Sequence, residues 1–156
     1  MRPVRLAIPF TLLLLAACQQ AKDEAAQPNP DAKPGLRVSD AELVLPAVKG
    51  NPGAAYFTLA NKGDKVVELA SVFIDGAARA EMHETRGGAM DSLAKLPVRK
   101  GEVVKFERGG KHVMLFDLDA KLQPGATAEM TLTFTDGDKL SAPIEVKSAG
   151  DAGEAS

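Results

Sequence analysis

The sequence has one cysteine and no tryptophan, and its positive and negative charges almost cancel. A single cysteine excludes an internal disulfide, a CxxC redox pair and a zinc site built from thiolates. A formal net charge of −2 excludes the strongly basic surface that binding to a phosphate backbone needs, so we expect no nucleic-acid partner. We also find no nucleophile with a base and an orienting group, no paired carboxylates at an apolar site and no phosphate loop. We therefore expect no enzymatic activity.

The N-terminus has the pattern of a bacterial lipoprotein signal. Two arginines precede an apolar run that is shorter than the roughly 20 residues a membrane-spanning helix needs. The run ends in Leu15-Ala16-Ala17-Cys18, which resembles the lipobox in which the cysteine is lipidated and becomes the mature N-terminus. We interpret residues 1–17 as a lipoprotein signal peptide and Cys18 as a periplasmic lipid anchor, in preference to an ordinary cleaved signal with a cysteine nearby by chance. Gln19, where an aspartate would indicate inner-membrane retention, favours the outer membrane.

Composition divides the rest of the chain into three parts. Residues 18–35 are polar and rich in alanine and proline, which is typical of a flexible tether. Residues 36–148 carry the apolar patterning of a folded domain. Residues 149–156 resemble the tether and are predicted to form a disordered tail. We therefore expect a single-domain, lipid-anchored monomer.

Short runs of alternating apolar and polar residues fill the folded part. The runs Ala55–Leu59 and Met130–Thr135 are examples, and Asp136-Gly137-Asp138 supplies a turn after the second. No segment carries the apolar stripe of an amphipathic helix, and no internal repeat is visible. Fourteen glycines and ten prolines agree with many turns and short elements. The pattern predicts an all-β Greek-key β-sandwich of seven to nine strands.

Both histidines of the sequence have a methionine within two positions, in Met82-His83 and in His112-Val113-Met114. Residues i and i+2 of a strand project to the same face, so His112 and Met114 can ligate one ion together. His83 and Met90 flank a glycine-containing segment that suits a hairpin, which would bring these two residues near each other. We therefore predict a metal site made of His83, Met90, His112 and Met114.

The chemistry of this ligand set favours one metal. Two imidazoles and two thioethers are soft and uncharged, and Cu(I) prefers such a set. Zinc would take thiolate or carboxylate in place of thioether, and a blue-copper electron-transfer centre would need a cysteine thiolate. Methionine also keeps its ability to bind Cu(I) outside the cytoplasm, where thiols are oxidised. The ligand set therefore predicts Cu(I) as the bound ion.

Several of these residues also have a purely structural interpretation. Met130 lies in an alternating apolar strand and is predicted to be a core residue. Met82 lies on the opposite strand face from His83, so a core position is favoured over a ligand. His112 could be a surface residue, but the repeated pairing of His with Met favours the ligand interpretation. Three nearby carboxylates could orient the imidazoles or shape docking, although solvated strand-end charges are the favoured interpretation: Glu81, Glu84 and Asp91.

The spacing of these residues resembles that of the PCuAC-type periplasmic copper chaperones. The family pattern is a His, a ten-residue spacer, a Met, a 21-residue spacer and then His-x-Met. Here 21 residues separate Met90 from His112, and His112-Val113-Met114 completes the pattern. The run Gly53–Asn61 also resembles the family's alternating strand that ends in Asn. Only six residues lie between His83 and Met90, and removing an even number preserves the strand face, although the shorter hairpin could leave Met90 out of reach.

The resemblance implies a fold and a function. The family fold is a cupredoxin-like or Ig-like β-sandwich that holds Cu(I) and passes it toward the copper centres of cytochrome oxidase. The implied partner is a copper-acceptor protein, namely a cytochrome oxidase subunit or an assembly factor. The alternative, from another class, is a structural or adhesive Ig-like lipoprotein in which the His/Met pairs are incidental.

Overall fold

The computed structural model describes residues 34–151, which form ten β-strands and no helix. The signal peptide, Cys18, nearly all of the predicted tether and the end of the predicted tail lie outside the described residues. Within the described range no helix is long and apolar enough to cross a membrane. The strands are β1 (Leu36–Val44), β2 (Gly53–Asn61), β3 (Val67–Ile74), β4 (Ala77–Arg86), β5 (Ala89–Ser92), β6 (Leu96–Val98), β7 (Val103–Phe106), β8 (Lys111–Leu118), β9 (Thr127–Phe134) and β10 (Lys139–Lys147).

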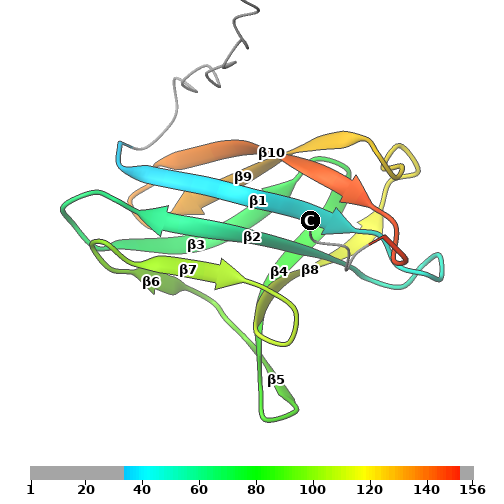
Figure 1. The fold of residues 1–156 in the computed structure, drawn as a ribbon, viewed down its shortest axis with the longest axis horizontal. Coiled ribbons are helices and arrows are strands. Elements are labelled where there is room, and N and C mark those ends of the chain that lie inside the picture. The colour runs from blue at the N-terminus through cyan, green and yellow to red at the C-terminus, as the bar shows by residue number, and fades with distance from the viewer. Residues whose placement is uncertain (1–33, 152–156) are drawn as a thin grey trace, which may run out of the picture.

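The strands are hydrogen-bonded in the order β5-β4-β8-β7-β2-β1-β10-β9-β3-β6, with an additional pairing of β8 with β2. Most neighbours are antiparallel, whereas β1 with β10 and β7 with β8 are parallel. Figure 1 shows this sheet folded over into two facing layers, with β1, β2 and β7 in one and β3 and β9 in the other. The fold is the cupredoxin-like or Ig-like β-sandwich that the sequence predicts.

The count of ten strands exceeds the predicted seven to nine because three strands are very short. β5, β6 and β7 have four, three and four residues, and in β5 and β6 this is too few for an alternating pattern to be recognised. β6 contains Pro97 and lies at the end of the strand order. A proline lacks the backbone N–H that a central strand would need, and an edge strand tolerates that loss.

The core lies between the two layers and is built by strand alternation. In β2 every second residue is buried, and Phe57 stacks on Phe106 of β7 with ring centroids 4.2 Å apart. Met130 is completely buried and Met82 is 5% exposed, which confirms the prediction that both belong to the core. The burial of Met82 turns its neighbour His83 to the outward face of β4.

Asn61 is a buried polar residue at the end of β2. Its side-chain amide donates hydrogen bonds to the backbone oxygens of Lys65 and Val98, and its side-chain oxygen accepts one from the backbone N–H of Gly63. These bonds satisfy the side chain in the core and tie the turn after β2 to the end of β6.

Candidate metal centre

The two histidines face each other across the pairing of β4 with β8. His83 is the register partner of His112, and their rings lie roughly parallel with centroids 6.0 Å apart and an interplanar angle of 23°. The adjacent pair, Met82 with Val113, is buried on the opposite face. Because core packing fixes that pair on the inner side, both imidazoles point to the outward face of the sheet.

Met114 lies on the same outward face, two residue pairs along from the histidines. It is the register partner of Glu81 on β4 and of Ala54 on β2. Its side chain is half-buried, and its neighbours in the strand, Val113 and Leu115, are completely buried. The alternation of β8 therefore places the imidazole of His112 and the thioether of Met114 side by side, as strand geometry predicts.

Met90 lies on this face too, but on the other side of the histidine pair. It is the register partner of Thr85, whereas Ser92 is the residue directly opposite His83. Met90 is therefore a diagonal neighbour of His83, at a separation of about 7–8 Å between backbones, which a long side chain can bridge. The side chain is 54% exposed. The structure brings His83, His112 and Met114 together and leaves Met90 at the margin.

A tight hairpin carries Met90. Gly87 and Gly88 both have positive φ, 58° and 87°, and link Arg86 to its register partner Ala89. A two-residue turn with two left-handed residues joins antiparallel strands without disturbing their twist, and glycine adopts that conformation without steric cost. The β4–β5 hairpin projects from the two layers (Figure 1), and all four residues of β5 are exposed. Met90 therefore sits on an arm at the edge of the site.

The backbone of the β7–β8 loop determines which nitrogen of His112 is free. The Nδ1 atom of His112 lies 3.0 Å from the backbone oxygen of Gly110. A carbonyl oxygen can only accept, so Nδ1 carries the hydrogen and donates it. The lone pair is then on Nε2, which is the atom of His112 available to a metal ion. Metal-binding histidines are commonly held by a hydrogen bond of this kind.

In His83 the two ring nitrogens have the opposite roles from those in His112. Its Nε2 atom lies 3.3 Å from a carboxylate oxygen of Glu81, while its Nδ1 atom is buried and has no hydrogen-bond partner in the described part of the chain. Buried ring nitrogens are nearly always satisfied, and a bound ion is one of the explanations for an exception. The donor set of His83, His112 and Met114 therefore fits a soft metal ion.

The neighbouring carboxylates have different roles. Glu84 accepts a hydrogen bond from Lys111 at 2.8 Å and pairs with Arg86, and the Lys111 ammonium holds the pKa of its carboxyl below the usual value. Asp91 is exposed, as the sequence interpretation expects. Glu81 contacts His83, so the interpretation of Glu81 as a solvated strand-end charge misses this contact. The contact could have been predicted from the sequence, because residues i and i+2 of a strand, here Glu81 and His83, lie on the same face.

Among the residues that the structure describes, the histidine pair is not part of a larger group of His, Cys, Asp or Glu side chains that could hold a metal ion. Over residues 34–151, no three His, Cys, Asp or Glu side chains are grouped so that they could hold a metal ion. Zinc sites of the usual kind take three or four such ligands. The donors beside the histidine pair include the thioether of Met114, and Cu(I) is a first-row ion that accepts thioether sulfur readily.

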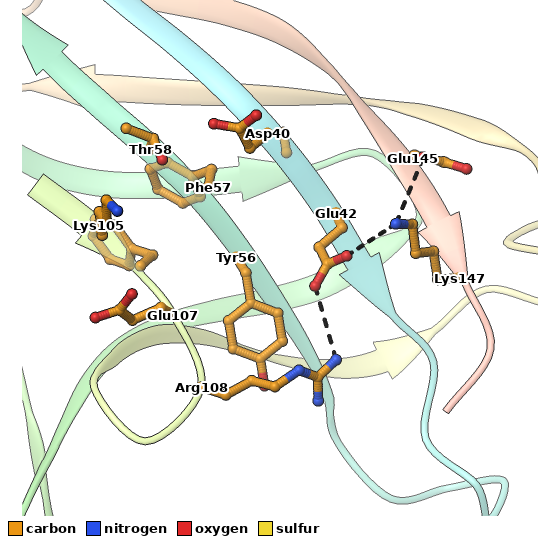
Figure 2. Close-up of a pocket in the computed structure, with 12 residues that line it drawn as sticks. Asp40, Glu42, Tyr56, Phe57, Thr58, Lys105, Glu107, Arg108, Glu145 and Lys147 are labelled. Atoms are coloured by element: carbon orange, nitrogen blue, oxygen red, sulfur yellow. Dashed lines mark ion pairs between the residues drawn. The ribbon is translucent and has the colours of Figure 1, made fainter. Parts of the chain in front are cut away.

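A separate groove of about 730 Å³ lies on β1, β2, β7 and β10. None of the four predicted ligands is among its lining residues. Figure 2 shows Glu42 between two cations, 3.1 Å from Lys147 and 3.8 Å from Arg108, while the guanidinium of Arg108 lies over the ring of Tyr56. Glu145 lies 3.9 Å from Lys147 as well, so two carboxylates face two cations, and we do not assign a ligand to the groove.

Comparison with known proteins identifies the family. The profile of the family described as "Putative lipoprotein LpqE-like" matches residues 36–146. The chain belongs to the LpqE-like family. Among relatives, "Putative lipoprotein Lxx21020" of Leifsonia xyli subsp. xyli is 27% identical over 148 residues, covering 92% of this chain and 88% of the relative. This LpqE-like chain thus matches that protein over nearly its whole length.

Solved structures similar to this LpqE-like chain include copper-bound proteins. The solution structure of CuI-DR1885 from Deinococcus radiodurans is 29% identical, with a TM-score of 0.62 and coverage of 81% of this chain and 85% of that chain. The copper-bound PCuAC domain from PmoF2 is 20% identical, with a TM-score of 0.63 and coverage of 73% and 93%. The predicted resemblance to PCuAC-type domains is confirmed.

Proposed function

We propose that this protein is an extracytoplasmic copper chaperone that binds one Cu(I) ion and transfers it to an acceptor protein. The observation that carries the proposal is the outward-facing pair of His83 and His112, with the unpartnered Nδ1 of His83 and the thioether of Met114 beside it. The ion is the cargo, held by the Nδ1 atom of His83, the Nε2 atom of His112 and the sulfur of Met114. Met90 supplies the fourth ligand from the hairpin.

The exposure of Met90 suits transfer. A carrier must let ligands of the acceptor enter the coordination sphere before its own ligands leave. Met90 is 54% exposed on a strand that, among the described strands, is bonded only to β4, so it can leave the ion without disturbing the core. Uncharged soft ligands also release Cu(I) without a proton transfer, because neither thioether nor neutral imidazole must be deprotonated to bind.

The comparisons support this proposal through the copper-bound relatives. DR1885 was solved with Cu(I) and shares 29% identity with this chain. We propose a copper centre of cytochrome oxidase, or one of its assembly factors, as the acceptor. The support is the spacing from Met90 to His112-Val113-Met114, which this sequence shares with the PCuAC-type chaperones.

The test is an anaerobic titration with Cu(I) against a competing chelator. The chain from Gln19 onward is suitable because it retains all ten strands and lacks the Cys18 thiol, which would bind Cu(I) itself. We expect one Cu(I) per chain and an X-ray absorption spectrum with both sulfur and nitrogen scatterers. A stoichiometry near zero, or a spectrum with light scatterers only, would contradict the proposal and favour an adhesive or structural role.

We further propose that Cys18 carries a lipid that anchors the protein outside the cytoplasm. The lipobox-like sequence supports this, as does membership of a family described as lipoproteins. We expect the wild-type protein to fractionate with membranes, with the outer membrane favoured by Gln19, and the Cys18→Ala variant to lose membrane association because no thiol is left to acylate. Equal membrane association of both proteins would contradict the anchor.

A further inference from the structure

A chain of contacts runs along the outward face of β4 and ends at His83. The guanidinium of Arg79 lies 4.1 Å from the centre of the Phe116 ring and pairs with the Oε1 atom of Glu81 at 2.5 Å. The other carboxylate oxygen, Oε2, lies 3.3 Å from the Nε2 atom of His83. Arg79, Glu81 and His83 alternate along one strand and share a face, and Phe116 is the register partner of Arg79 on β8.

Each oxygen of the Glu81 carboxylate thus has its own partner. Oε1 is engaged by a cation that is itself packed on an aromatic ring, so the carboxylate is held in place before it meets the histidine. Oε2 can only accept a hydrogen bond, so it requires a hydrogen on the Nε2 atom of His83. The tautomer of His83 that remains has its lone pair on Nδ1, the buried atom without a partner.

We propose that Glu81 is a positioning residue that fixes the Nε2–H tautomer and the ring orientation of His83, so that Nδ1 is presented to Cu(I). This inference rests on the proposed function for the identity of the ion. Glu81 is also the register partner of Met114, so its carboxylate stands beside two of the ligands and places a negative charge near the bound cation. The Oε2 atom faces the Nε2 atom of His83, so we assign Glu81 a role that acts through His83 and not that of a ligand.

Three substitutions separate the possible roles of this residue. Glu81→Leu removes both the acceptor oxygen and the charge. Glu81→Gln keeps an oxygen that can accept from Nε2–H but removes the charge that pairs with Arg79. Glu84→Gln is the matched control, because Glu84 is a neighbouring carboxylate on the same strand that bonds to Lys111 and Arg86 and not to an imidazole.

The first measurement is made without copper, on the chain from Gln19 onward. Nitrogen-15 NMR of the imidazoles at neutral pH reports the tautomer and detects an N–H that is protected from exchange. We expect the wild-type, Glu81→Gln and Glu84→Gln proteins to show His83 as a single Nε2–H tautomer with a protected N–H. We expect Glu81→Leu to lose the protected N–H. A wild-type His83 with its hydrogen on Nδ1, or an unchanged His83 signal in Glu81→Leu, would overturn the inference.

The second measurement is the affinity for Cu(I) in competition with a chelator. We expect Glu81→Leu to weaken binding about 10- to 100-fold, which is typical for losing the residue that orients a metal-binding histidine. Glu81→Gln should bind within a few-fold of wild type and Glu84→Gln as wild type. If Glu81→Gln bound as weakly as Glu81→Leu, the ion pair or direct ligation would explain the effect and the positioning role would be wrong. Absence of Cu(I) binding in the wild type would contradict the proposed function, while the copper-free NMR would still decide the role of Glu81.

Discussion

Replacing His112 with alanine is expected to weaken Cu(I) binding about a hundredfold, which corresponds to about 2.7 kcal/mol. The variant loses one of two imidazoles that face each other with ring centroids 6.0 Å apart, and no other imidazole in the chain can take its place. The strand itself should survive, because the buried neighbours Val113 and Leu115 are unchanged. The measurement is a Cu(I) affinity in competition with a chelator, together with a circular dichroism spectrum that checks the fold.

Two methionine variants serve as comparisons for His112→Ala. Met90→Leu should weaken binding less, by under about tenfold, since Met90 is exposed and two residue pairs away from His83. Met130→Leu should leave binding unchanged, because Met130 is completely buried in the core and leucine nearly conserves its volume. Loss of binding in Met130→Leu with unchanged binding in His112→Ala would show that the metal site has been assigned to the wrong residues.

Replacing Phe57 with alanine is expected to lower the free energy of unfolding by about 3–5 kcal/mol. Phe57 is 1% exposed and stacks on Phe106 at 4.2 Å, so the substitution removes apolar burial and leaves a cavity between β2 and β7. Many domains have only about 5–15 kcal/mol of stability in total, so the variant would be close to unfolding at room temperature. The measurement is a urea denaturation curve of the copper-free protein.

Phe73→Ala is the matched control for this prediction. Phe73 is 56% exposed on β3, so the same chemical change should alter the free energy of unfolding by only about 0.5 kcal/mol. Equal destabilisation by the two substitutions would show that the stacked pair of Phe57 with Phe106 does not hold the layers together as the structure indicates.

Much of the fold could be predicted because it depends on alternation within single strands. That rule placed Met82 and Met130 in the core and set His112 and Met114 on one face, since each statement needs only the position of a residue along its own strand. The short strands β5 and β6 could not be predicted in the same way. Four and three residues carry almost no pattern of their own.

The arrangement of the predicted site depends on which residues of neighbouring strands lie opposite each other. No single stretch of the sequence determines this register. The pairing of His83 with His112 follows from how β4 and β8 pack their inner faces, including Met82 against Val113. The face of Met90 was predictable from the even change in spacer length, but its position opposite Thr85 follows from the two-glycine turn. The contact of Glu81 with His83 depends in turn on Arg79 and on Phe116, which lies on another strand.

The two ends of the strand order bear on how this protein behaves when many copies are crowded together. An open sheet edge offers free N–H and C=O groups that can pair with another molecule and start aggregation. Here one edge strand has three residues and includes Pro97, and the other has four and carries the charge of Asp91. Short edges, a proline and a charge are the usual obstacles to such pairing. These two end strands therefore resist pairing with the strands of another molecule.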